Sequence, residues 1–120
     1  MAPMSTIVER LRNVDDADAR LIARFEALDF EIEYIREDIE SRYSDEDLDR
    51  AYRSIMANQI SSDDFKTAVG KEFEAQVLFL EGVVVLTLPS TRYDGSVASF
   101  DRHEELPINR LIDVASDIEH

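Results

Sequence analysis

Three apolar runs follow one another between residues 73 and 101, namely residues 73–80, 83–88 and 96–101. Short runs rich in β-branched and aromatic residues, with turn residues between them, are typical of adjacent antiparallel strands. In Val77–Leu88 both alternating faces are apolar, whereas a sheet open to water on one side alternates apolar with polar positions. We therefore expect three strands in the middle of a sheet whose two faces are covered, by helices or by another subunit.

Two short turns are expected to connect these strands. Glu81-Gly82 suits a two-residue hairpin, but Glu is not the favoured first residue of a type I′ turn, so a bulged loop is an equal alternative. Tyr93-Asp94-Gly95 has the composition of the second turn.

An earlier pair of strands is expected in the N-terminal third of the chain. Phe30–Tyr34 alternates apolar with acidic residues, which is typical of a half-exposed strand. The periodicity of residues 19–28 fits one face of a helix and one face of a strand equally well. Because the strand at Phe30–Tyr34 needs a neighbour and Ala27-Leu28-Asp29 can form a tight connection, we favour a hairpin of two strands.

Amphipathic helices are expected near both ends of the chain. Apolar residues at helical spacing in residues 5–14 predict a short helix, for which Ser5 is a candidate N-cap. Pro107 suits the first position of a C-terminal helix of about ten residues. The apolar stripe of that helix consists of Ile108, Leu111, Ile112, Ala115 and Ile118.

A pair of helices is expected between the two groups of strands. Ser44 and the three acidic residues after it make the strongest helix start, because the hydroxyl can cap the first turn and the acids suit the helix dipole. This helix is predicted to end at about Asn58. Residues 61–64 offer a second cap, for a short helix that stops at Gly70. The apolar face of the first helix comprises Leu48, Ala51, Tyr52, Ile55 and Gln59.

The resulting order is helix, two strands, helix pair, three strands and helix, in a chain of 120 residues without an evident linker. This order predicts a single domain, residues 1–120, of α+β class: an antiparallel sheet of about five strands with helices on both faces. Residues 1–4 and 119–120 are expected to fray. No apolar run is long enough to span a membrane and the N-terminus lacks the features of a secretion signal, so we expect a cytoplasmic protein without a membrane partner.

Acidic residues dominate the charge of the chain. It contains 27 Asp and Glu against 13 Lys and Arg, for a formal net charge of −14. Such a surface repels phosphate backbones, so nucleic acid is an unfavoured partner. Only Lys66 and Lys71 are lysines, and the other basic residues are arginines. This pattern favours a salty cytoplasm, where screening relieves self-repulsion; the alternative is an ordinary acidic protein.

Sequence motifs for catalysis or cofactor binding are lacking. The chain has no cysteine, and its three glycines cannot build a P-loop or a dinucleotide fingerprint. The acidic run that begins at Asp45 lacks the Gly and Glu that an EF-hand loop requires. His103 is interpreted as a solvated loop side chain. We therefore expect no enzyme activity, no cofactor and no metal.

Five positions are candidates for an interaction or ligand-facing role: Arg36, Tyr52, Arg53, Gln76 and Leu78. Arg36 follows the second expected strand, where either a ligand-facing guanidinium or a salt-bridged strand exit fits. Tyr52 lies on the apolar face of the helix that begins after Ser44, and Arg53 belongs to the most basic face of that helix. Gln76 and Leu78 lie in the first of the three C-terminal strands.

Several segments of the chain resemble a group of small acidic proteins of unknown function from halophilic archaea. These segments are Tyr34–Ile39, Ser44–Asp49, Val77–Pro89 and Gly95–Asp101. The resemblance covers roughly residues 19–115, implies a haloarchaeal cytoplasm and a strand before Tyr34, and names no activity. Separately, the expected order of elements resembles that of roadblock and profilin-like domains, which often dimerise and scaffold regulators of small GTPases.

Three functional hypotheses follow from these observations. The first is a non-catalytic regulatory or protein-interaction module that forms a homodimer or binds a protein partner. The second is a small-molecule sensor of the PAS type, with an apolar pocket lined by Phe30, Ile32 and Tyr52. The third is a transcription accessory factor, which is weakened because no helix carries a purely basic face.

The net charge makes a testable prediction about salt. Because a charge of −14 repels itself when it is not screened, we expect the protein to lose its fold as salt is diluted from molar concentrations. Circular dichroism during dialysis from high to low salt measures this loss. A chain that stays cooperatively folded in dilute buffer contradicts the halophilic interpretation.

Overall fold

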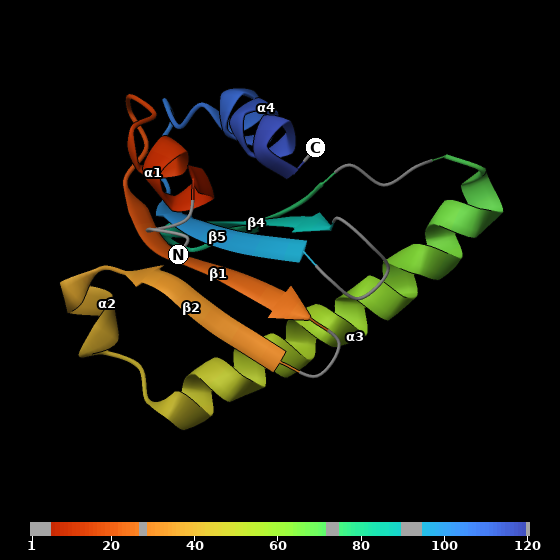
Figure 1. Ribbon diagram of the computed structural model, residues 1–120, viewed down its shortest axis with the longest axis horizontal. Coiled ribbons are helices and arrows are strands. Elements are labelled where there is room, and N and C mark those ends of the chain that lie inside the picture. The colour runs from red at the N-terminus through yellow and green to blue at the C-terminus, as the bar shows by residue number, and fades with distance from the viewer. Residues whose placement is uncertain (1–5, 27–28, 72–74, 90–94, 120) are drawn as a thin grey trace.

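The computed structural model contains one antiparallel sheet of five strands in the order β2-β1-β5-β4-β3 (Figure 1). It describes residues 6–26, 29–71, 75–89 and 95–119. The elements are α1 (Thr6–Arg12), β1 (Ala19–Glu26), β2 (Asp29–Ile35), α2 (Glu37–Glu40), α3 (Asp45–Val69), β3 (Gln76–Leu80), β4 (Val83–Pro89), β5 (Gly95–Asp101) and α4 (Ile108–Glu119). The predicted α+β class is confirmed.

The segment whose periodicity was ambiguous is strand β1. It pairs with β2 on one side and β5 on the other, and Glu26 lies opposite Asp29, so Asp29 belongs to β2 rather than to the connection. The register shifts between Ile22 and Ala23 and between Ala19 and Leu21. These irregularities break the strict alternation of a strand, which explains why periodicity alone did not separate strand from helix.

One face of the sheet is covered by α1 and α4, which lie beside each other in Figure 1. Their apolar residues meet the inward side chains of β1, β4 and β5, as the amphipathic patterns predicted. Pro107 directly precedes α4 instead of opening it, and its carbonyl accepts a hydrogen bond from the Leu111 N–H at 3.0 Å. The buried cluster on this face comprises Ile7, Val8, Leu11, Val14, Ala19, Ile22, Val84, Leu86, Leu88, Ala98, Phe100, Leu106, Leu111 and Ala115.

The other face is crossed by α3, which is one helix of 25 residues. The prediction of two helices, with a break after Asn58 and a new cap at residues 61–64, is wrong. No Pro or Gly lies between Asp45 and Val69, and Ser and Asp in a helix interior cost only a few tenths of a kcal/mol each relative to the best helix formers, so nothing forces a break. The predicted ends at Ser44 and Gly70 are confirmed, since Gly70 has φ 73°.

The apolar face of α3 that approaches the sheet contains fewer residues than the sequence predicted. Leu48, Tyr52 and Ile55 are half-buried, whereas Ala51 is exposed. The helix that precedes α3 is α2, a single turn that the sequence did not predict and that buries Ile39.

The β3–β4 connection is the two-residue hairpin, not the bulged loop. Leu80 lies opposite Val83, which leaves only Glu81 and Gly82 in the turn. Gly82 has φ 72°, a left-handed conformation that glycine adopts without steric cost. The second predicted turn falls mostly outside the described residues, and its Gly95 is the first residue of β5.

The prediction that both faces of the C-terminal strands are covered holds for β4 and β5 but not for β3. β5 is the middle strand of the sheet, whereas β3 forms an edge. Leu78, Phe79 and Leu80 of β3 are 43%, 55% and 52% exposed. Within a single chain, α3 reaches β3 at Gln76, through the hydrogen bond with Asn58, but the helices leave Leu78, Phe79 and Leu80 exposed.

The cap of α3 generates a stability prediction. The Ser44 hydroxyl accepts a hydrogen bond from the Asp47 N–H at 3.1 Å, and the Asp47 carboxylate accepts one from the Ser44 N–H at 3.0 Å. Ser44→Ala should lower the free energy of unfolding by about 1 kcal/mol, measured by denaturant titration. Ser54→Ala is the matched control, because Ser54 is an exposed mid-helix serine; an equal loss in both variants contradicts a capping role.

Candidate functional site

The five candidate residues do not form one site in the structure. Arg36 lies where β2 ends, in an ion-pair network. Tyr52 lines a groove between α3 and β2. Arg53 is an exposed helix residue whose guanidinium lies 2.8 Å from the Asp49 carboxylate. Gln76 and Leu78 lie on the edge strand β3, where Gln76 forms a hydrogen bond with Asn58 of α3.

Arg36 binds two carboxylates and joins distant segments of the chain. Its Nε lies 2.6 Å from Asp38 Oδ1, and its Nη1 lies 2.7 Å from Asp101 Oδ2 at the end of β5. The same Asp101 carboxylate lies 3.3 Å from Nη1 of Arg20 in β1. Since its guanidinium is already bound to two carboxylates, this geometry favours a salt-bridged strand exit over a ligand-facing Arg36.

The ion pairs of this network shift the pKa values of Arg36, Asp38 and Asp101 toward their charged forms. Hydrogen bonds from Arg36, and then from Arg20, hold the pKa of Asp101 below its usual value, although burial acts in the opposite direction. Hydrogen bonds to Asp38 and then Asp101 raise the pKa of Arg36. Arg36, Asp38 and Asp101 are therefore charged at neutral pH, and the network ties β1, β5 and α2 together.

A groove of about 360 Å³ lies between β2 and the first turns of α3. The Phe30 and Tyr52 rings line it, with their centroids 5.2 Å apart and their planes tilted by 41°. The Tyr52 hydroxyl donates a hydrogen bond to the Glu26 carbonyl at 2.8 Å, which anchors the ring against the β1 end. The complete lining is Asp29, Phe30, Ile32, Asp45, Leu48, Asp49 and Tyr52.

The groove has apolar walls and an acidic rim. Its apolar and aromatic side chains are half-buried, whereas its three aspartates are exposed. Partial burial raises the pKa of Tyr52, and the negative charges of Asp29 and then Asp49 raise it further. The potential at this ring is therefore negative.

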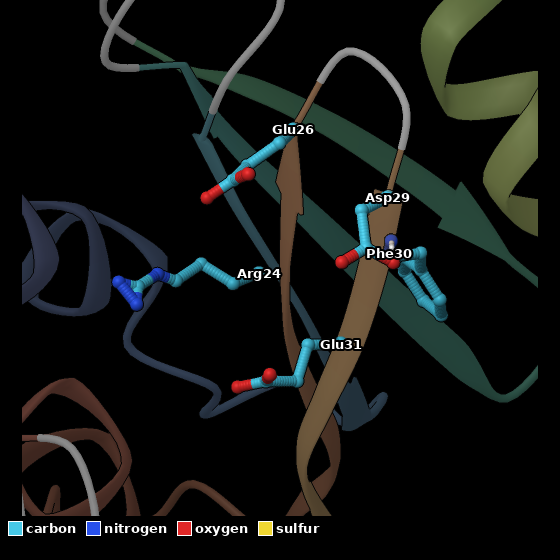
Figure 2. A pocket seen from close by; sticks show the side chains of 5 residues that line it. All are labelled: Arg24, Glu26, Asp29, Phe30 and Glu31. Atoms are coloured by element: carbon cyan, nitrogen blue, oxygen red, sulfur yellow. Dashed lines mark hydrogen bonds between the residues drawn. The ribbon is translucent and has the colours of Figure 1, made fainter.

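A smaller cavity of about 50 Å³ lies beside the end of the β1–β2 hairpin. Figure 2 shows Arg24, Glu26 and Glu31 extending to one side of the two strands, while the Phe30 ring points to the other side. Nη1 of Arg24 also lies 4.0 Å from the Glu33 carboxylate. This cavity is smaller than typical ligand sites, and its charged side chains are those of a solvated pair of strands.

His103 contacts the backbone rather than solvent alone. Its Nε2 lies 2.8 Å from the carbonyl oxygen of Asp16, which links the β5–α4 connection to the α1–β1 connection. The neighbouring Arg102 lies over the Phe79 ring, at 5.0 Å from its centroid, and donates a hydrogen bond to the Leu80 carbonyl at 3.1 Å. Arg102 therefore supports the β3–β4 hairpin, whereas His103 ties the two connections together.

The two edges of the sheet differ in charge. β2 carries Asp29, Glu31 and Glu33, whereas β3 has the sequence QVLFL and carries no charge. Charged residues on an edge strand oppose pairing with another chain, and their absence permits it. Apolar exposure continues in the last turns of α3, where Phe65 and Val69 are 69% and 51% exposed.

Comparison with known protein families matches residues 5–120 to a domain of unknown function, DUF7522. The chain belongs to the DUF7522 family. Membership in a family of unknown function agrees with the resemblance found in the sequence. Comparisons with curated proteins and with solved structures give no significant match. In the described part of this DUF7522 chain, no helix is long and apolar enough to cross a membrane.

Sequence reasoning missed the partners of the Arg36 network and the aspartates that rim the groove, although it did place Phe30, Ile32 and Tyr52 together in a pocket. Asp101 meets Arg20 and Arg36 only because β5 pairs with β1, a contact between distant parts of the chain. Asp29 and Asp45 were interpreted only as parts of a turn and a helix start. Two signals pointed to the groove: the alternation at Phe30–Tyr34 placed Phe30 and Ile32 on the same face, and the helical spacing placed Tyr52 on the apolar face of its helix.

The Asp101 network generates a pH prediction. A carboxylate whose pKa is lowered by folding stabilises the protein above its unfolded pKa of about 3.9, and this contribution disappears as pH falls through the folded pKa. Asp101→Asn should therefore lower the free energy of unfolding by about 1 kcal/mol at pH 7. This value is at the low end for charge-assisted hydrogen bonds, because the Asp101 side chain is 37% exposed. The difference in the free energy of unfolding between this variant and the wild type should shrink below about pH 4.

Denaturant titrations at several pH values measure this difference. Asp113→Asn, at an exposed carboxylate of α4, is the control for removing one negative charge. A destabilisation by Asp101→Asn that is the same at pH 3 and pH 7 contradicts an ionic role for the network.

Proposed function

We propose that this DUF7522 protein is a non-catalytic regulatory or protein-interaction module that acts as a homodimer in the cytoplasm of a halophilic cell. The observation that carries the proposal is the uncharged edge strand β3, with three consecutive exposed apolar side chains. The dimer forms when the β3 edges of two copies meet.

The register shows what a second copy would cover. Leu78 lies opposite Val85, and Leu80 lies opposite Val83, so both leucines point to the face that α3 crosses. Val83 and Val85 are themselves only half-buried. Fully burying an apolar side chain of this size contributes roughly 1.5–3 kcal/mol. Because these side chains are already partly covered, each contributes about half of that or less, and covering several in each copy stabilises an association.

The lack of charge on β3 permits a second copy of the chain as the occupant. Each chain carries a net charge of −14, so two copies repel each other over most of their surfaces. The β3 strand is a segment where this repulsion is locally weakest, because it contains no charged residue. Two antiparallel edge strands can also pair their backbone groups symmetrically.

The organisation of the fold supports the same proposal by analogy. The observed order of helices and strands is the one that resembled roadblock and profilin-like domains, in which dimerisation is frequent. Fold analogy does not establish a function, so the exposed edge remains the primary support. The acid excess and the scarcity of lysine support the halophilic setting.

A second candidate function is a small-molecule sensor of the PAS type. One observation supports it: Phe30, Ile32 and Tyr52 line the groove beside α3 together, as that hypothesis required. A small molecule that co-purifies with the native protein and is detected by mass spectrometry after denaturation supports this function, and protein free of any such molecule contradicts it. The transcription-factor hypothesis gains no support, because Arg50 and Arg53 of α3 pair with Glu46 and Asp49.

The dimer generates a mutational prediction. At molar salt, sedimentation equilibrium should give twice the chain mass of 13.8 kDa for the wild type. Leu78→Glu combined with Leu80→Glu should weaken dimerisation at least about a hundredfold, because it places four carboxylates at the apolar contact and removes its apolar area. A wild type that is monomeric under these conditions overturns the proposal.

Tyr43→Glu is the matched control, since Tyr43 is another exposed aromatic residue but precedes α3 rather than lying on β3. It should leave the dimer intact. Circular dichroism of each variant establishes that the monomer is folded, and a folded double variant that still dimerises also contradicts the proposed interface.

A further inference from the structure

The groove between β2 and α3 combines two features that together recognise one chemical group. Its aromatic wall is formed by Phe30 and Tyr52, and its rim carries Asp29 and Asp45. An aromatic face attracts a cation through its ring quadrupole, and a nearby carboxylate attracts the same cation. No basic residue is among those that line the groove.

We propose that this groove binds an arginine side chain of a partner polypeptide, with the guanidinium between the aromatic wall and the aspartate rim. The inference rests on the proposed role as a protein-interaction module, but it does not depend on the dimer, because the groove borders β2 and the proposed dimer edge is β3, at opposite edges of the sheet.

The shape of the groove favours a side chain over a free small molecule. Small-molecule sites bury most of the ligand surface. Here none of the lining residues is buried, and three of them are exposed aspartates, so the groove is shallow. A side chain that is held by further contacts of its own polypeptide does not need an enclosed pocket.

The chemistry favours arginine over lysine. Guanidinium is planar and weakly hydrated and stacks on aromatic rings, whereas ammonium holds its water more strongly. The described part of the chain already contains this kind of contact. Arg12 lies 4.1 Å from the centroid of the Tyr34 ring, and Arg102 lies 5.0 Å from that of Phe79.

The aspartates are not equally available to a partner. Asp49 already pairs with Arg53 at 2.8 Å, and the guanidinium of Arg53 is directed to it rather than to the aromatic rings. One oxygen of Asp29 accepts a hydrogen bond from the Phe30 N–H at 2.8 Å. Asp45, in the first turn of α3, is therefore the carboxylate whose removal tests the site most cleanly.

The test is a titration of the ¹⁵N-labelled full chain, followed by NMR at the lowest salt that keeps it folded. The probe is the blocked peptide Gly-Ser-Arg-Ser-Gly, and the comparison peptide carries citrulline, which has a similar shape but no charge. The arginine peptide should shift amide signals of the groove, and the citrulline peptide should not. Asp45→Asn and Tyr52→Leu should each weaken binding about threefold.

Two controls separate the site from general attraction to an acidic protein. Asp64→Asn removes an exposed aspartate from the same helix, outside the groove, and should leave affinity unchanged. Tyr52→Phe keeps the ring but loses the hydroxyl that donates to Glu26, and should bind nearly as well as wild type.

Two results overturn the proposal. One is a set of shifts spread over the acidic surface with no difference between Asp45→Asn and Asp64→Asn. The other is ethylguanidinium binding as tightly as the peptide, which would assign the groove to a small cation. Sedimentation at molar salt, beside the titration, separates the two inferences: a dimer at molar salt without peptide binding in the titration overturns the groove alone, and peptide binding by a chain that is monomeric at molar salt overturns the dimer alone.

Discussion

The central strand β5 imposes the constraint on which the rest of the structure depends. It is apolar or small on both faces and pairs with β1 and β4, so both faces of the sheet must be shielded from water. The helices α1 and α4 shield Ala98 and Phe100 on one face. The long helix α3 crosses the other face, where Val97 and Phe25 are buried. This second cover reaches β3 at Gln76 but not at residues 78–80, and the exposed edge follows from that incomplete cover.

The charge distribution makes the exposed β3 edge an exception on the surface of this protein. A chain with a net charge of −14 is protected from association over most of its surface, so an uncharged apolar strand at an edge is a specific exception. The groove at the opposite edge has the complementary character, with carboxylates around aromatic rings. We therefore propose that the β3 edge contacts a second copy of the chain and that the groove beside β2 contacts a basic partner.

The sequence predicted local features well and long-range ones poorly. The Ser44 cap, the Gly70 stop and the two-residue turn at Glu81-Gly82 are encoded by a few neighbouring residues, and all three are present. The length of α3 was misjudged because Ser61-Ser62-Asp63-Asp64 has the composition of a cap, although a continuous helix tolerates it. The Asp101 network and the edge position of β3 depend on strand order, which hydrophobic periodicity does not contain.

Amide hydrogen exchange in β3 tests the central claim most directly. If the β3 edges of two copies pair, the amides of Gln76–Leu80 should become more protected as protein concentration rises through the dimerisation range, while the amides of β2 at the other edge should not change. Exchange in β3 that is fast and independent of concentration at molar salt would contradict the account.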